Sequence, residues 1–197
     1  MNDHTREHDG AGFADTEVLL AGFGGQGILM AGKLLAHAAM DHGLQVSWLP
    51  SYGPEMRGGT AHVIVCMSRH PIGSPYTDRP RALAVMNGPS LEKFASTVRP
   101  GGIIVIDRTM VEGPSGRDDC LTVGLPARAL AREAGSERAS NLAVLGAYVG
   151  ASGVLPVEQL ERAIRGEFSG RKAKYADASV AAFHAGVQAG RQVGATA

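Results

Sequence analysis

Cysteine is scarce in this chain of 197 residues, which contains only Cys66 and Cys120. Neither has a second cysteine at Cys-x-x-Cys spacing, and no other spacing typical of metal ligands is visible. This argues against a zinc ribbon or an iron–sulfur cluster held by this chain alone. Because the start of the chain lacks an export signal, we expect both thiols to be reduced and partly buried.

Net charge and aromatic residues are lacking as well. Lys and Arg together number 19, as do Asp and Glu, so no overall field attracts the chain to nucleic acid or to an anionic membrane. Aromatic residues make up only 5% of the chain, so the core must be built mainly from Ala, Val, Leu, Ile and Gly. That composition favours helices packed on a parallel sheet over a sandwich of aromatic-rich strands.

Long apolar runs are absent too. The longest apolar helical stretch, residues 28–40, contains Lys33 and His37 and is too short to cross a bilayer. The first residues are polar and include no apolar secretory segment. We therefore expect a cytoplasmic protein with neither a membrane nor a nucleic acid as partner.

Short apolar runs alternate along the chain with stretches of helical periodicity. We expect one domain over residues 16–190, flanked by a disordered tail at 1–15 and a short tail at 191–197. The expected fold class is α/β, a three-layer, doubly wound, Rossmann-like domain with a helical C-terminal third. Strands are expected at residues 17–22, 45–49 (ended by Pro50), 60–68, 82–87, 103–107 and 118–124, and helices at 25–42, 89–98, 126–134, 140–152, 156–168 and 173–188.

Two glycine-rich loops follow the first two expected strands. The first, residues 22–27, reads GFGGQG and fits the G-x-G-x-x-G pattern between a strand and a helix. A dinucleotide site also needs an acidic residue at the end of the second strand, and residues 47–51 contain none. The loop therefore predicts contact with phosphate or pyrophosphate more than it predicts NAD binding. The alternative is that its glycines only let strand and helix approach closely.

The second loop, residues 51–60, reads SYGPEMRGGT and carries Glu55 and Arg57 between glycines. These side chains can pair with each other, with a partner subunit or with a charged ligand, and a guanidinium can bind carboxylate or phosphate through two hydrogen bonds. Trp48, Tyr52 and Met56 add apolar surface, a mixture typical of interface anchors. The alternative is a solvated turn with a surface ion pair of little energetic value.

Asn87 and Asn141 are the remaining candidates for ligand binding. Asn87 ends a buried strand at the edge of the sheet where ligands bind, and Asn141 begins an apolar helix. Each is equally suited to capping a helix or to hydrogen bonding in the core. His62 fits better as a sheet-face histidine, and the basic cluster at 171–174 as a solvated helix start. No nucleophile–base–acid set is visible, so we expect no catalytic residue and no metal site here.

Six segments of the chain resemble the gamma subunit, or gamma domain, of 2-oxoacid:ferredoxin oxidoreductases of the pyruvate, 2-oxoglutarate and ketoisovalerate type. The resemblance extends in order from about Val18 to Lys174, and the PEMRGG loop with the downstream Asn-x-Pro-Ser segment is specific. Gly88 stands where many members have a bulkier residue, and residues 1–15 match nothing. The matching segments are 22–28, 50–61, 71–75, 86–94, 99–102 and 141–147.

The resemblance implies a multi-subunit enzyme that oxidatively decarboxylates a 2-oxoacid to an acyl-CoA and is inactive as this chain alone. Thiamine diphosphate, Mg²⁺ and iron–sulfur clusters would lie on partner alpha, beta and delta subunits, and ferredoxin would accept the electrons. This chain would contribute to coenzyme A binding and to active-site assembly, the latter through Glu55 and Arg57. The cofactor-binding positions that it implies are Gly22, Gly24, Gly25, Gln26, Gly27, Ser51, Tyr52, Gly58, Gly59, Asn87 and Asn141.

Two alternatives stay open beside this interpretation. A stand-alone Rossmann-like protein would bind NAD or a nucleotide unaided, and the missing acidic residue after the second strand counts against it. A purely structural assembly subunit would contact no ligand. The identity of the 2-oxoacid is also open, since pyruvate, 2-oxoglutarate, branched-chain and aryl-pyruvate enzymes all use this domain.

Overall fold

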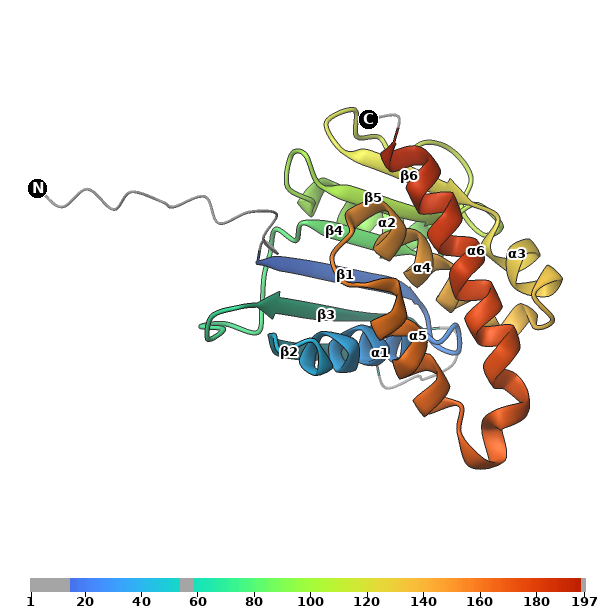
Figure 1. Ribbon diagram of the computed structural model, residues 1–197. Helices are drawn as coiled ribbons and strands as arrows, with labels where there is room; N and C mark the ends of the chain where they lie inside the picture. Colours follow the sequence, from blue (N-terminus) through green and yellow to red (C-terminus); the bar gives the residue numbers. More distant parts are fainter. Residues whose placement is uncertain (1–14, 54–58, 196–197) are drawn as a thin grey trace, which may run out of the picture.

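Six strands form one sheet in the order β2-β3-β1-β4-β5-β6 (Figure 1). The computed structural model describes residues 15–53 and 59–195. The strands are β1 (Thr16–Phe23), β2 (Gln45–Tyr52), β3 (Thr60–Ser68), β4 (Ala82–Val85), β5 (Ile103–Asp107) and β6 (Leu121–Leu125). The α-helices are α1 (Ile28–Asp41), α2 (Gly88–Phe94), α3 (Ala127–Glu133), α4 (Ser140–Ser152), α5 (Val157–Glu167) and α6 (Ala176–Gly194). Three short 3₁₀ helices are η1 (Ala95–Thr97), η2 (Glu137–Ala139) and η3 (Gly170–Tyr175).

The sheet is mixed, because β3 runs antiparallel to both of its neighbours, β1 and β2. The strands β1, β4, β5 and β6 are parallel. A parallel neighbour requires a crossover connection, and the segment that joins β2 to β3 contains only residues 53–59. Helices lie on both sides of this sheet, and the expected α/β class is confirmed. The second glycine loop connects two antiparallel strands.

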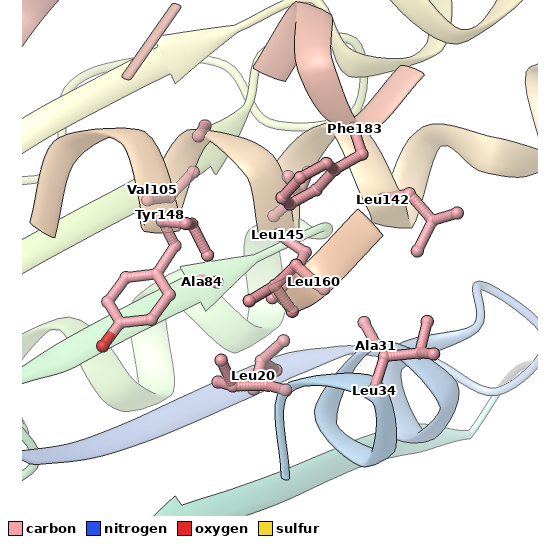
Figure 2. Packing of buried hydrophobic residues seen from close by; sticks show 14 of the residues in the cluster. Leu20, Ala31, Leu34, Ala84, Val105, Leu142, Leu145, Tyr148, Leu160 and Phe183 are labelled. Carbon is pink, nitrogen blue, oxygen red and sulfur yellow. The ribbon is translucent and has the colours of Figure 1, made fainter. Parts of the chain in front are cut away.

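The two faces of the sheet are covered unequally. Leu20 of β1 faces a large core shared with α1, α3, α4, α5 and α6, whereas Leu19 faces a smaller core under α2 and η1. This alternation follows from the period of two in a β-strand. Figure 2 shows side chains from β1, α1, α4, α5 and α6 directed into the larger core, namely Leu20, Leu34, Leu145, Leu160 and Phe183.

Several element boundaries differ from expectation. Pro50 does not end the second strand, since β2 continues to Tyr52 and Pro50 pairs with Val63. β2 is an edge strand, where a residue without an N–H group is tolerated if that position faces away from the neighbouring strand. The helix expected over 89–98 becomes 3₁₀ after Phe94. The last helix runs to Gly194, six residues beyond its expected end and into the segment expected to be a tail.

Helices α4 and α6 lie so close together that their contact requires glycine. A Cβ atom added at Gly146 would collide with the carbonyl oxygen of Phe183, and one at Gly186 with that of Ala143. Gly190 meets the carbonyl oxygen of Ala147 in the same way. The obstacles are backbone atoms, which cannot rotate aside.

None of the helices within 15–53 and 59–195 combines the length and apolarity needed to cross a membrane.

Candidate functional site

The carboxyl ends of β1 and β4 form a switch point of the sheet. The two strands are parallel neighbours, yet α1 follows β1 onto the larger core and α2 follows β4 onto the smaller one. In open α/β sheets, ligands bind in the crevice that such a divergence leaves outside the strand ends. The first glycine loop and Asn87 both lie at this edge, as the sequence predicted.

The first glycine loop leaves several backbone donors free. Gly25 and Gly27 adopt positive φ angles of 98° and 77°. A Cβ atom added at Gly25 would meet none of the described residues within 4 Å. Within the described residues, no acceptor is paired with the N–H groups of Gly25 and Gly27, and α1 begins without a side-chain cap. Free N–H groups at the positive end of a helix are suited to anions.

The side chain of Gln26 is hydrogen-bonded within the chain. Its Oε1 accepts a hydrogen bond of 2.6 Å from the N–H of Phe23, and its Nε2 donates one of 3.0 Å to the carbonyl oxygen of Met86. The carboxamide therefore joins the end of β1 to the residue that follows β4. The cofactor contact that the resemblance implied for this residue stays a prediction beside these internal hydrogen bonds.

Each of the two asparagines has one of the structural roles that the sequence left open. Asn87 caps a helix, and Asn141 forms an internal hydrogen bond. Oδ1 of Asn87 caps α2 by accepting from the N–H of Ser90 at 2.8 Å. Nδ2 of Asn141 donates to the carbonyl oxygen of Gly27 at 3.0 Å. Each residue is 1% exposed, and each keeps one buried polar atom without a hydrogen-bond partner in the described structure: Nδ2 of Asn87 and Oδ1 of Asn141.

The second glycine loop meets the first. The N–H of Gly24 donates to the carbonyl oxygen of Gly59 at 2.8 Å, which brings two predicted site residues together. Ser51 and Tyr52 lie on the exposed end of β2, with Tyr52 57% exposed. Glu55, Arg57 and Gly58 lie outside the described residues, so their predicted roles in site assembly and binding remain predictions.

His62 packs on the sheet face that α2 covers, with its ring centroid 5.1 Å from that of Phe94. Burial lowers the pKa of His62 below its ordinary value, and the nearby Lys93 ammonium lowers it further. A neutral, half-buried histidine fits the structural interpretation.

The basic cluster at 171–174 also has a structural role in part, because Lys172 forms an ion pair of 2.9 Å with Glu167.

Both cysteines are free, as expected, and burial raises the pKa of each thiol. The protonated form that burial favours is the less reactive one. Cys66 lines a cleft of about 340 Å³ near the other end of β1 from the glycine loop. The ion pair between Glu17 and Arg99, at 3.1 Å, lies beside it.

One buried acid at the carboxyl edge was missed by the sequence interpretation. Asp107 ends β5 and is 1% exposed. Its Oδ1 accepts hydrogen bonds from the N–H groups of Thr109 at 3.0 Å and Ala127 at 3.2 Å. It thereby fixes the turn after β5 and the start of α3. The available signal was an acidic residue at the end of an otherwise apolar strand.

The fold defines the class of the protein, a Rossmann-like α/β domain with a strand switch point at the carboxyl ends of β1 and β4. The chain belongs to the pyruvate ferredoxin/flavodoxin oxidoreductase family, whose model matches residues 17–189. The resemblance found in the sequence is thereby confirmed.

Relatives of the chain differ in length. Ketoisovalerate oxidoreductase subunit VorA of Methanothermobacter marburgensis is 42% identical over 182 residues, covering 91% of this chain and only 37% of that protein. The gamma subunit of keto/oxoacid ferredoxin oxidoreductase from Geobacter sulfurreducens PCA is 28% identical, with a TM-score of 0.75, covering 89% of this chain and 98% of that one. The 2-oxoglutarate:ferredoxin oxidoreductase from Magnetococcus marinus, with 2-oxoglutarate, coenzyme A and succinyl-CoA bound, shares the fold. Its TM-score is 0.82 at 23% identity, covering 90% of this chain and 31% of that one.

Proposed function

We propose that this chain is the gamma subunit of a multi-subunit 2-oxoacid:ferredoxin oxidoreductase, a cytoplasmic assembly that oxidatively decarboxylates a 2-oxoacid to an acyl-CoA. Family membership and the match to nearly all of a gamma subunit support this assignment. Partner alpha, beta and delta subunits supply thiamine diphosphate, Mg²⁺ and iron–sulfur clusters, and ferredoxin accepts the electrons. The chain itself binds part of coenzyme A and helps to complete the active site.

The first glycine loop carries the coenzyme A part of this proposal. Within the described residues, a Cβ atom at Gly25 would meet nothing within 4 Å, and the N–H groups of Gly25 and Gly27 lack acceptors. These donors lie at the uncapped N-terminus of α1. Coenzyme A carries phosphate groups, and such a helix start favours phosphate through both its N–H groups and its dipole. The Magnetococcus marinus enzyme of the same fold has coenzyme A bound.

The second loop is proposed to complete the site across a subunit boundary. Gly59 holds this loop against Gly24, so Glu55 and Arg57 belong to a segment whose end is fixed at the ligand edge. Tyr52, at the other end of the segment, exposes an aromatic ring of the kind enriched in interfaces. We assign Arg57 to a carboxylate or phosphate of the assembled site.

Gly25→Val in the assembled complex tests the ligand role. A β-branched side chain at this position obstructs the free N–H groups, so the KM for coenzyme A should rise by roughly tenfold or more. The KM for the 2-oxoacid should stay close to that of the wild type. Gly43→Val is the matched control, because Gly43 also has a positive φ (86°) in open space but lies after α1. An unchanged dependence on coenzyme A would reject the loop as a phosphate site and favour a purely structural subunit.

A further inference from the structure

Gln26 lies at the point where the pairing of β1 with β4 ends. The last paired residues are Ala21 and Val85, and one more hydrogen bond joins the N–H of Met86 to the carbonyl oxygen of Ala21 at 3.0 Å. Beyond this point the chain turns toward α1 on one side and α2 on the other. Phe23 N–H and Met86 C=O are therefore left without their ladder partners at this edge of the sheet.

The Gln26 carboxamide replaces the missing partners. It supplies an acceptor to Phe23 and a donor to Met86, the same pair of groups that a backbone peptide would offer. Gly22 leaves the room for this arrangement, because a Cβ atom there would lie 2.6 Å from Oε1 of Gln26. The main chain around Gln26 is fixed as well, through the turn bond from its N–H to the carbonyl oxygen of Phe23 at 3.1 Å.

We propose that Gln26 is a positioning residue that fixes the first glycine loop against the end of β4, so that the N–H groups of Gly25 and Gly27 are held in place for a phosphate of the ligand. This inference rests on the proposed function of the loop. This role follows from the hydrogen bonds that Oε1 and Nε2 of Gln26 form within the chain. Removing the clamp should weaken ligand binding more than it affects the chemical step.

Two substitutions separate positioning from charge. Gln26→Met is close in size and neutral but can neither accept from Phe23 nor donate to Met86. Gln26→Glu keeps an acceptor for Phe23 and, when ionised, opposes the Met86 carbonyl oxygen. Only the protonated glutamate can donate to that oxygen. Gln45→Glu is the matched control for the charge, because Gln45 is exposed at the start of the edge strand β2.

The test measures turnover of the assembled complex against coenzyme A concentration at several pH values. Gln26→Met should raise the KM for coenzyme A by roughly tenfold at every pH, with kcat close to that of the wild type. Gln26→Glu should raise the KM for coenzyme A as well, because a carboxylate at the start of α1 stays ionised at these pH values and opposes the Met86 carbonyl oxygen. Gln45→Glu should follow the wild type throughout.

Three results would overturn the inference. A wild-type KM in Gln26→Met would remove the positioning role, and a loss of kcat equal to the rise in KM would indicate a different role. A wild-type KM in Gln26→Glu would show that the donor to Met86 is unimportant. Gly25→Val distinguishes these results from failure of the proposed function, because an unchanged KM in that variant rejects the site itself. In the isolated chain, hydrogen exchange at the Phe23 amide should be faster in Gln26→Met and unchanged in Gln45→Glu.

Discussion

Asn141, in the first turn of α4, donates a hydrogen bond of 3.0 Å to the carbonyl oxygen of Gly27, which lies 114 positions earlier and caps α1. The contact fixes the start of the α1 helix to a residue that is 1% exposed. The glycine loop is thus held from one side by Asn141 and from the other by Gln26. A rigid loop loses less conformational entropy when it binds a ligand.

Gly27→Ala should destabilise the chain more than Gly43→Ala. Both glycines have positive φ, so each alanine costs about 1–2 kcal/mol of backbone strain. At Gly43 the new Cβ would meet none of the described residues within 4 Å. At Gly27 it would lie 2.6 Å from Nδ2 of Asn141, a buried side chain that is already hydrogen-bonded. We expect a further loss of about 1–3 kcal/mol in the free energy of unfolding, measured in urea. Equal losses at both positions would show that Asn141 yields without cost.

Gly186→Ala should be among the most destabilising changes in the chain. Its Cβ would collide with the backbone of Ala143, so α4 and α6 would have to separate, at a cost of about 3 kcal/mol or more. Gly166→Ala is the matched control near the end of α5, where a Cβ meets nothing within 4 Å and alanine should stabilise by up to about 1 kcal/mol. Thermal or urea unfolding of the two variants gives the comparison, and similar effects would contradict the close packing.

Lys93→Gln should raise the pKa of His62 but leave it below 6.5. The larger cause of the lowered pKa, burial, remains in this variant, and only the repulsion by the Lys93 ammonium is removed. NMR titration of the His62 ring measures this directly. Lys33→Gln, on the opposite face of the sheet, should leave the titration unchanged. A larger pKa shift from Lys33→Gln would mean that His62 responds to overall charge.

The same lowered pKa makes stability depend on pH. Above pH 6.5 His62 is neutral in both the folded and the unfolded chain, so its full contribution is present. As the pH falls from 6.5 toward the folded-state pKa, the unfolded chain binds the proton first and stability declines. Replacement of His62 by Gln should remove this part of the decline in urea unfolding measured between these pH values.

Most strands were predictable because each is a short apolar run whose side chains alternate between two cores, as in Leu19 and Leu20. The antiparallel direction of β3 could not be predicted in this way, since it depends on which strands pair across the sheet. Pro50 was misjudged for a related reason. Proline ends a central strand, but whether β2 lies at an edge is a property of the whole sheet.

Some features of the candidate site were also predictable from the sequence, and others were not. The glycine loop was recognisable from local spacing, because positive φ at Gly25 and Gly27 is a local requirement. The contacts of Gln26 with Met86 and of Asn141 with Gly27 were not recognisable, since these pairs lie 60 and 114 positions apart along the chain. An amide side chain fits ligand binding, capping and core bonding equally well until its neighbours are known. Asp107 was overlooked for the same reason.

Reconstitution tests the central claim most directly. The purified chain, the thiamine-binding and iron–sulfur partner subunits without it, and the full assembly should each be given 2-oxoacid, coenzyme A and ferredoxin. We predict no ferredoxin reduction by the chain alone, and formation of acyl-CoA only when the chain is present with its partners. Turnover by the isolated chain would contradict the account, as would full coenzyme A-dependent activity of the partners without it.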